Sequence, residues 1–528
     1  MKQAALFLLI LAGWLAVAAG SPIMAAPTPD PRVDDAVWAQ MDARGRADVI
    51  LLLPQADLTP AYALPDKPTR GRWVVAALRA QARATQPPLL AALAQMGVDY
   101  QAFWVVNGVR AQVDARQLDR VLRLPQVQRV TANAPFRGVG PEPEPGVAAQ
   151  STTAAIPWGV QRVEAPWAWA QGVTGQGVVI AGQDTGYDWT HETLKRAYRG
   201  YDPVADAVSH DYNWHDAIHA INPNNNGDNP CGLDSPEPCD DYGHGTHTMG
   251  TMVGNDLPPD AAGWPAAAPH PIGVAPGATW IGCRNMERGW GMPSTYIECF
   301  QWFVAPWPLG GDPNADGDPD RAPDIINNSW SCPTSEGCRP ENLDVIEPAL
   351  NAADAAGILV VASAQNSGPS CNTIREPIAI YPKAFTVGAT DSNDNLASFS
   401  SRGPVTYDGV TRIGPDISAP GVSVYASLPN NRYGFSSGTS MAGPHVAGVA
   451  ALLLAARPEL KGHPDRIRAA LTTLADPKTS SQGCGGDAAD AIPNNGYGWG
   501  IVNARTALSP PRIFLPLATH TLSSQATP

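Results

Sequence analysis

The sequence predicts an α/β protein built on a mainly parallel sheet and preceded by a small α+β domain. Apolar runs at 177–183 and 357–362 are typical of strands that a parallel sheet buries on both faces. Small-residue runs after positions 244 and 440 indicate buried helices. Between 47 and 131, short strands alternate with helices, which favours an antiparallel sheet covered on one face.

Residues 1–25 have the pattern of a signal peptide. Lys2 supplies one positive charge, and an apolar run at 4–19 follows it. Cleavage after Gly20 or Ala25 suits the small residues there, and the alternative is a retained N-terminal anchor. No later run is long and apolar enough to predict a membrane span.

Residues 26–136 form the expected α+β domain. Aspartate is a favoured helix cap and Asn-Gly is a hairpin signal, so both mark boundaries between its elements. The expected elements are a strand at 47–54, a helix at 72–96 interrupted by Pro87-Pro88, two strands around Asn107-Gly108, a helix from Asp114 to Leu124 and a strand at 127–131.

The region 137–157 is expected to be a linker, because 138–146 is rich in Pro, Gly and Glu and should be extended and unpacked. The large domain follows at 158–508. For the tail at 509–528, a frayed terminus is favoured over docking on the domain or surface attachment.

Ser440 is the candidate nucleophile. It lies at the expected start of a helix, whose N–H groups and dipole favour developing negative charge. A serine hydroxyl needs a base for activation, and His244, between two glycines, suits that task near neutral pH. Asp184 ends an apolar strand, where α/β proteins place their sites, and it can orient the histidine.

The order Asp184, His244, Ser440 along the chain matches the subtilisin arrangement and differs from the chymotrypsin and α/β-hydrolase orders. Three motifs accompany these residues: Asp184-Thr-Gly, His244-Gly-Thr-His and Gly438-Thr-Ser-Met-Ala. With them the chain resembles the subtilisin-like serine proteases, the subtilase family (peptidase family S8), and within it the bacillopeptidase F type.

The resemblance runs through 158–508 and implies a subtilisin-like three-layer α/β/α fold. The domain at 26–136 resembles the family's inhibitory propeptide, of the inhibitor I9-like and ferredoxin-like kind; an unrelated accessory domain is the alternative. The chain would then be an inhibited precursor that cuts itself near the linker at 137–157. His247 and His445 are expected to pack inside helices rather than act as bases.

The resemblance also implies that Asn366 and the N–H of Ser440 hold the oxyanion. The chain departs from the family at Gln365, where glycine is usual, and a side chain there is expected to narrow the neighbouring pocket or alter the loop. A peptide would lie extended along two strand edges. The residues expected at those edges are Ser329, Trp330 and Ser331, and Ala362, Ser363 and Ala364.

Composition fits an exported hydrolase. The net charge of −14 argues against nucleic acid or an anionic membrane surface as a partner. Eight cysteines in an exported chain indicate disulfides rather than a metal site. Neighbouring positions suggest the pairs Cys231–Cys239, Cys283–Cys299, Cys332–Cys338 and Cys371–Cys484, although other connectivities are open.

Two polar loops, at 312–320 and 222–228, are candidates for structural calcium, because calcium favours clusters of hard oxygen ligands. A solvated loop is the alternative for each, and catalysis itself is expected to need no cofactor. The first loop offers Asp312, Asn314, Asp316, Asp318 and Asp320.

The sequence therefore predicts a secreted or cell-surface endopeptidase, expected to be a monomer, that hydrolyses protein or peptide substrates through an acyl-enzyme and is inhibited by its own propeptide. Two other classes stay open. A catalytically silent binding protein on the same scaffold would not need the triad. A transferase would pass the acyl group to an amine, and product analysis with an added amine separates it.

Overall fold

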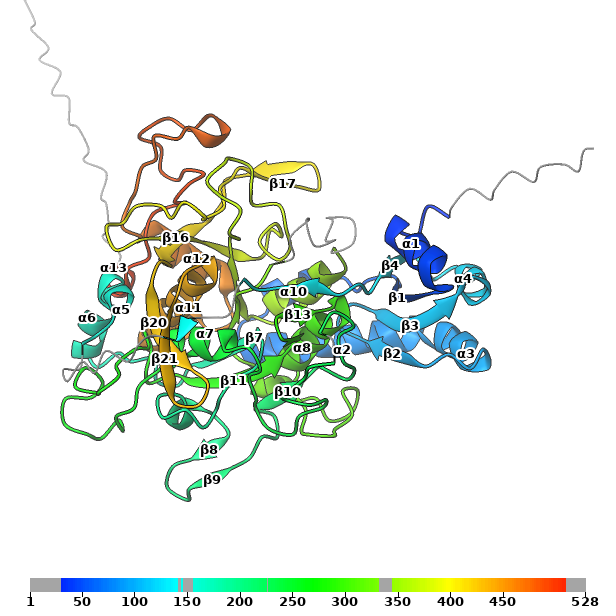
Figure 1. The fold of residues 1–528 in the computed structure, drawn as a ribbon, viewed down its shortest axis with the longest axis horizontal. Helices are drawn as coiled ribbons and strands as arrows, with labels where there is room; N and C mark the ends of the chain where they lie inside the picture. Colours follow the sequence, from blue (N-terminus) through cyan, green and yellow to red (C-terminus); the bar gives the residue numbers. More distant parts are fainter. Residues whose placement is uncertain (1–29, 141–143, 146–154, 226, 332–343, 510–528) are drawn as a thin grey trace, which may run out of the picture.

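The computed structural model describes residues 30–140, 144–145, 155–225, 227–331 and 344–509. Within them the chain forms a small N-terminal domain and a larger domain around a seven-stranded sheet (Figure 1). The predicted signal peptide, the tail from 510 onward and the predicted Cys332–Cys338 pair lie outside the described residues.

The N-terminal domain contains a four-stranded antiparallel sheet in the order β2-β3-β1-β4. With its helices this is the ferredoxin-like β-α-β-β-α-β arrangement. The elements are α1 (Asp35–Arg44), β1 (Arg46–Leu52), α2 (Lys67–Thr85), α3 (Pro87–Gln95), β2 (Tyr100–Phe103), β3 (Gly108–Asp114), α4 (Ala115–Leu122) and β4 (Arg129–Ala132).

Local signals fix most of these boundaries. Pro87 begins α3, which confirms the predicted interruption, and Asp114 caps α4 by accepting from the Gln117 N–H at 2.8 Å. Helix α1 was not predicted. It buries only Val37 and Met41, so its apolar pattern is too sparse to stand out from a polar segment.

The large domain is built on seven strands that all pair in parallel, in the order β10-β11-β7-β14-β15-β16-β19. Its strands are β7 (Val179–Asp184), β10 (Trp214–Asp216), β11 (Thr279–Arg284), β14 (Ile325–Asn328), β15 (Leu359–Ser363), β16 (Phe385–Thr390) and β19 (Ile417–Pro420). Its helices are α5 (Trp158–Arg162), α6 (Ala165–Ala170), α7 (His244–Val253), α8 (Pro293–Val304), α10 (Glu347–Ala355), α11 (Thr439–Ala456), α12 (Pro464–Thr473) and α13 (Ala504–Leu508).

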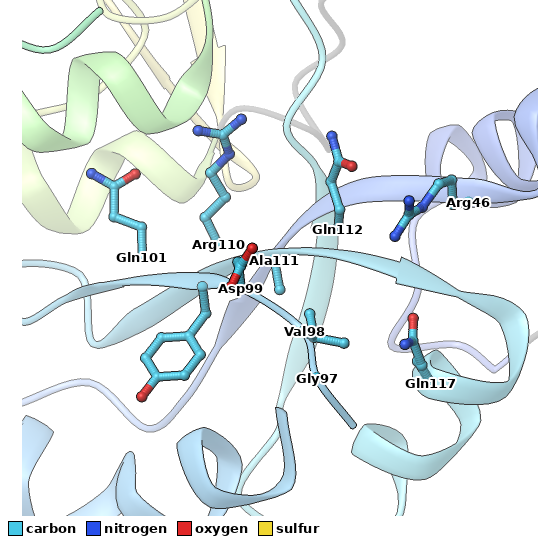
Figure 2. Close-up of a pocket in the computed structure, with 10 residues that line it drawn as sticks. Arg46, Gly97, Val98, Asp99, Gln101, Arg110, Ala111, Gln112 and Gln117 are labelled. Carbon is cyan, nitrogen blue, oxygen red and sulfur yellow. The ribbon is translucent and has the colours of Figure 1, made fainter. Parts of the chain in front are cut away.

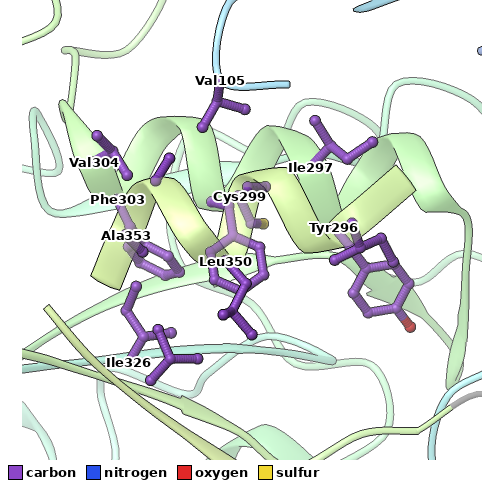
Figure 3. Close-up of a cluster of buried hydrophobic side chains, with 14 of the residues drawn as sticks. Val105, Tyr296, Ile297, Cys299, Phe303, Val304, Ile326, Leu350 and Ala353 are labelled. Carbon is purple, nitrogen blue, oxygen red and sulfur yellow. The ribbon is translucent and has the colours of Figure 1, made fainter. Parts of the chain in front are cut away.

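Two hydrophobic cores lie on opposite faces of this sheet. Neighbouring strand residues alternate between them: Ile325 belongs to the core with α7 and α11, and Ile326 belongs to the core with α8 and α10. Figure 3 shows Ile326 below Phe303 of α8 and Leu350 of α10. Helices therefore cover both faces, and the predicted three-layer α/β/α fold is confirmed.

Helix α11 is the one described helix long and apolar enough to cross a membrane by length and composition. It is 89% buried inside the fold, where it packs against α7 and five sheet strands. Its apolar character is therefore explained by its place in the core.

The N-terminal domain shares the α8–α10 core of the large domain. Val105 enters that core above α8 (Figure 3), and the Trp104 N–H donates to Gln301 Oε1 at 2.7 Å. Lys67 forms an ion pair with Asp324 at 2.7 Å. The contact between the domains is thus apolar at its centre and charged at its margin.

Small two- and three-stranded sheets complete the fold. One joins β12 (Met286–Glu287), β13 (Trp290–Gly291) and β5 (Phe136–Arg137), and another joins β20 (Val424–Leu428), β21 (Arg432–Ser436) and β6 (Glu144–Pro145). Two hairpins lie apart from these sheets: β8 (Tyr201–Asp202) with β9 (Ala207–Val208), and β17 (Val405–Tyr407) with β18 (Val410–Arg412).

Three of the four predicted disulfides are formed: Cys231–Cys239, Cys283–Cys299 and Cys371–Cys484. A cavity of about 430 Å³ opens on the N-terminal domain, between the loop at 97–99 and β3 (Figure 2). Its lining includes Arg46, Asp99 and Arg110 but none of the predicted site residues, so it is not the site described below.

Candidate active site

Asp184 and His244 form a buried hydrogen-bonded pair at the candidate site. Asp184 ends β7 and His244 begins α7, and the His244 Nδ1 lies 2.8 and 3.0 Å from the two carboxylate oxygens. The Thr185 N–H also donates to Asp184 Oδ1 at 2.7 Å. The carboxylate therefore holds the proton on Nδ1 and leaves Nε2 as the basic nitrogen.

Glycine at position 245 allows this approach. A Cβ there would lie 2.0 Å from the Gly186 carbonyl oxygen and 3.1 Å from the Asp184 Cβ. Any larger residue would push the first turn of α7 away from the end of β7. The glycine after the histidine is thus a packing requirement of the His244–Asp184 contact.

Ser440 is the second residue of α11 and is 8% exposed. Its Oγ donates to the Ser329 carbonyl oxygen at 2.9 Å. Among the described residues no hydrogen bond joins the Ser440 and His244 side chains, although their helices α11 and α7 pack together. Catalytic hydrogen bonds often tighten only when substrate is bound, so a rotation of the Ser440 side chain can complete the pair.

Asn366 is exposed and lines the cavity that contains Ser440. Its Oδ1 accepts from the Thr439 N–H at 2.9 Å and from the Thr439 hydroxyl at 3.0 Å. These bonds fix the amide so that its NH₂ group remains as a donor beside the start of α11. That is the geometry an oxyanion donor requires.

Gln365 does not project as a free side chain across the pocket. It is buried at a positive φ of 79°, its Nε2 donates to the Glu376 carbonyl oxygen at 2.5 Å, and its Oε1 accepts from the Arg375 N–H at 3.2 Å. The side chain therefore ties the Asn366 loop to the segment at 375–376. That Gln365 alters the loop relative to the family stays a prediction.

Of the two predicted strand edges, one is open to an extended chain and the other is not an edge. The edge at Ser331 can pair with an extended chain, because the Ser331 N–H donates to the Gly138 carbonyl oxygen at 2.9 Å. Ala362, by contrast, is paired on both sides, with Asn328 of β14 and Thr386 of β16, so the expected edge there is an interior strand. The second edge of the cleft is β13, which the sequence analysis missed because its two-residue strand carries no periodic signal.

Around these edges, Ser363 lines the cavity, whereas Ala364 is buried and bonds to Val387 of β16. Trp330 is buried against the Tyr296 ring, with ring centroids 4.1 Å apart. The Phe136 ring stacks on Tyr296 as well, with ring centroids 5.0 Å apart. An aromatic wall thus flanks one end of the cleft.

The chain's own segment at 136–140 occupies this cleft. Phe136 and Arg137 pair antiparallel with β13, and the Gly138 N–H donates to the Gly289 carbonyl oxygen at 2.9 Å. Residues 138–140 line the same cavity of about 190 Å³ as Ser440. Beyond it, Glu144 and Pro145 pair with β21. The expectation of an unpacked linker at 138–146 is therefore wrong at these positions, because backbone pairing with two edges holds them.

His247 and His445 lie inside α7 and α11, as expected. His247 Nε2 lies 3.1 Å from the Val424 carbonyl oxygen, and His445 Nδ1 lies 2.9 Å from that of Met441. Burial lowers the pKa of His247 to about 3 and that of His445 to about 4. Both rings are therefore neutral packing residues at neutral pH.

The oxygens of the two candidate calcium loops are engaged with protein groups. Asp316 accepts from the Asp312 N–H at 2.8 Å, Asp318 accepts from the Asp320 N–H at 2.9 Å, and Asp320 forms an ion pair with Arg72. In the loop at 222–228, Asp228 forms an ion pair with Arg288. Calcium and a solvated loop both stay open for these two loops.

Comparison with known proteins places this geometry in a family. A model of the subtilase family matches residues 175–500. M-protease of Shouchella clausii (strain KSM-K16) is 32% identical over 365 residues, which are 68% of this chain and 72% of M-protease. Subtilisin BL of Lederbergia lenta is 31% identical over 357 residues, 67% of this chain and 98% of that protein.

Bacillopeptidase F of Bacillus subtilis (strain 168) is 37% identical over 420 residues, which are 77% of this chain. The match spans 26% of the length of that relative. The family match covers the strand that ends at Asp184, the helix that begins at His244 and the helix that carries Ser440. The chain belongs to the subtilase family, whose members are serine-type endopeptidases that need no cofactor for catalysis.

Proposed function

We propose that this chain is a secreted serine endopeptidase, made as a precursor that processes itself. Asp184, His244 and Ser440 are its triad, and Asn366 and the Ser440 N–H form its oxyanion site. The observation that carries the proposal is the extended segment at 136–140, which pairs with both cleft edges and lies in the cavity beside Ser440. A protease holds a peptide in this way.

In the proposed reaction, a scissile carbonyl enters beside Ser440, and the hydroxyl turns from Ser329 toward His244. His244 Nε2 takes the proton while Oγ attacks, and Asp184 stabilises the imidazolium that forms. The Asn366 NH₂ group and the Ser440 N–H donate to the oxyanion. His244 then returns the proton to the leaving amine, and water hydrolyses the acyl-enzyme.

The N-terminal domain is proposed to be an intramolecular inhibitor. Its docking contact continues through Val105 and Trp104 into the α8–α10 core, and the segment that follows β4 leads directly into the cleft. Substrates compete with this segment for the same two strand edges. Full activity therefore requires the domain to leave or be degraded after the chain is cut.

Export is proposed from the pattern at 1–25 and from the disulfides, which persist in oxidising compartments. Protein or peptide substrates and a monomeric mature enzyme are part of the same proposal. Structural calcium at 312–320 is also part of the proposal, supported by the carboxylates gathered there.

A covalent serine reagent tests the proposed nucleophile. The mature protein, treated with a fluorophosphonate, is expected to lose peptidase activity and to carry the label on Ser440, as read by mass spectrometry of the digest. His247 and His445 lie outside the proposed chemistry, so labelling should not depend on them. Full peptidase activity after stoichiometric labelling at another residue would refute the role of Ser440.

A further inference from the structure

Arg70 of the N-terminal domain ends in a pocket that belongs to the large domain. The residue lies near the start of α2 and is 1% exposed. Its Nε donates to the Ala355 carbonyl oxygen at 2.9 Å, its Nη2 donates to the Asp354 carbonyl oxygen at 3.1 Å, and its Nη1 donates to the Gly462 carbonyl oxygen. Three nitrogens of one guanidinium are thus bonded to three main-chain oxygens of the other domain.

These oxygens suit a planar cation. Asp354 and Ala355 lie in the last turn of α10, where carbonyl groups have no partner within the helix and the helix dipole favours positive charge. Gly462 supplies the third oxygen from the turn before α12. A guanidinium presents its N–H groups in a fixed fork, whereas an ammonium is a point charge on a flexible stem. The three oxygens therefore favour arginine over lysine.

The main chain at Gly462 makes room for the N-terminal domain. Gly462 has a positive φ of 84°, and a Cβ there would lie 2.7 Å from the Lys67 nitrogen and 2.9 Å from the Lys67 Cα. Any larger residue would therefore be strained and would push the start of α2 away from the large domain. This close approach of two main chains is a second observation, independent of Arg70, that the large domain receives the start of α2 here.

Two further side chains of the N-terminal domain flank Arg70. Lys67 forms its ion pair with Asp324, which is 5% exposed. The Tyr62 hydroxyl donates at 2.9 Å to the carboxylate of Asp354, which is 1% exposed, and the Tyr62 ring lies 5.1 Å from the Arg70 guanidinium. We call Tyr62, Lys67 and Arg70 the latch, because all three meet buried acceptors of the large domain.

The latch lies at the far end of β14 from Ser440. Asp324 directly precedes β14, and Ser329, whose carbonyl oxygen accepts from the Ser440 hydroxyl, directly follows it. The segment at 136–140 therefore contacts the large domain at one edge of the sheet, and the latch contacts it at the opposite edge. A cut in that segment leaves every latch contact in place.

We propose that the large domain carries a binding pocket for a guanidinium group at this edge, that Arg70 fills it in the precursor, and that this contact keeps the N-terminal domain bound after the chain is cut. The proposal rests on the inhibitor role proposed above and adds a second point of attachment to it. Two attachments reinforce each other, because the one that opens is held near its site by the other. Release of the domain therefore requires the latch to open as well as the cleft.

The test uses the full chain with Ser440→Ala and with the recognition sequence of an outside protease inserted between Ala148 and Ala149. The protein is cut there, immobilised through a C-terminal tag and washed, and the N-terminal fragment that comes off is followed over time. With Arg70 in place the fragment should stay bound. Arg70→Ala should raise its dissociation rate about 10- to 100-fold, the range expected when hydrogen bonds to a charged group are lost.

Rescue by guanidinium tests the chemistry of the pocket. In the Arg70→Ala protein, millimolar guanidinium should enter the vacated pocket and slow release at least about threefold, whereas ammonium at the same ionic strength should not. A residue that only supports folding would give no such rescue. Arg83→Ala is the matched control, because Arg83 lies on the same helix and is exposed. Its fragment should leave at a rate within about threefold of that measured with Arg83 in place.

Release of the Arg70→Ala fragment at the unchanged rate would overturn the proposal, and so would faster release that guanidinium does not slow. Arg70→Lys keeps the charge and loses the fork, so its fragment should also leave faster. This variant decides the question if the Arg70→Ala protein does not fold, and an unchanged rate for it then overturns the proposal.

The outcome is separable from that of the proposed peptidase function. The outside protease makes the cut, and the Ser440→Ala protein has no proposed nucleophile, so an unchanged release rate leaves the peptidase proposal standing. A mature protein whose Ser440 is not labelled by fluorophosphonate would refute the proposed nucleophile and would leave the measured effect of Arg70 as it is.

Discussion

Ser440 and Ser329 exchange two hydrogen bonds. The Ser440 hydroxyl donates to the Ser329 carbonyl oxygen at 2.9 Å, and the Ser329 hydroxyl donates to the Ser440 carbonyl oxygen at 2.7 Å. The first bond holds the proposed nucleophile in a resting orientation. The second satisfies a buried carbonyl in the first turn of α11 and joins that helix to the end of β14.

Replacing Ser329 by Ala should therefore lower stability. It leaves the buried Ser440 carbonyl without its side-chain donor, at a cost of about 1–3 kcal/mol. Denaturant unfolding in a Ser440→Ala background measures this without self-digestion. Ser481→Ala, at an exposed serine, is the control. Equal midpoints for the two variants would show that the Ser329 hydroxyl contributes nothing to the helix start.

Asp184→Asn should leave the fold intact and lower turnover by about 10⁴, because an amide stabilises the wrong tautomer of His244. The rate against a peptide amide is the measurement, with Asp206→Asn, an exposed aspartate, as the control. Activity within about threefold of the parent would remove Asp184 from the mechanism.

Asn366→Asp separates two functions of one side chain. The carboxylate keeps an oxygen that can accept from Thr439, as Oδ1 does at 2.9 Å, but it loses the NH₂ donor and places a negative charge near the oxyanion. We expect kcat to fall by at least the 10²–10³ known for loss of such a donor in subtilisin, a relative of this chain, with thermal stability little changed. A loss confined to KM would contradict the oxyanion role.

We predict that the Glu298–His219 pair makes the stability of the full chain sensitive to alkaline pH. Burial lowers the pKa of His219. The hydrogen bonds to Glu298 and Asp234, and the negative charges of these two residues, outweigh burial and raise the pKa of His219 to about 10. Burial raises the pKa of Glu298, yet bonds from His215 and His219 hold it well below its usual range. Gln101 of the N-terminal domain covers the pair, donating to Glu298 Oε2 at 2.6 Å.

Because the folded pKa of His219 is raised, its contribution to stability is fully present below the unfolded value of about 6.5 and is lost as the pH rises through about 10. In the Ser440→Ala background, the melting temperature should fall more between pH 7 and pH 10 than it does in a protein that also carries His219→Gln. If the melting temperatures of the two proteins fall by the same amount between pH 7 and pH 10, the Glu298–His219 pair does not have this role.

The proposed triad could be assigned from the sequence because each member sits in a local motif whose glycines and small residues are read directly from it. The same holds for Asp114 and Pro87 and for the pairs Cys231–Cys239 and Cys283–Cys299, which act through near neighbours in the sequence. The order of the three motifs along the chain then selected one fold among those that use a Ser-His-Asp set.

What the sequence could not predict depends on contacts between distant segments. Strand β13 is two residues long, and only its pairing with 136–137 identifies it as a cleft edge. Glu376 stands in a stretch with no periodic pattern, and only the cavity reveals that it lies beside Ser440. Ala362 looked like an edge because an apolar run does not tell whether one or two neighbours pair with it.

The most direct measurement of the central claim is N-terminal sequencing of the parent and the Ser440→Ala protein, each expressed without other active proteases. Ser440→Ala removes the proposed nucleophile with little change in volume. The parent should mature to a new N-terminus between about Ala132 and Pro157, a region that includes the segment seen in the cleft at 136–140. The Ser440→Ala protein should accumulate as a precursor that lacks only residues removed on export. Cleavage of both proteins at the same position would contradict self-processing and would assign maturation to an outside protease.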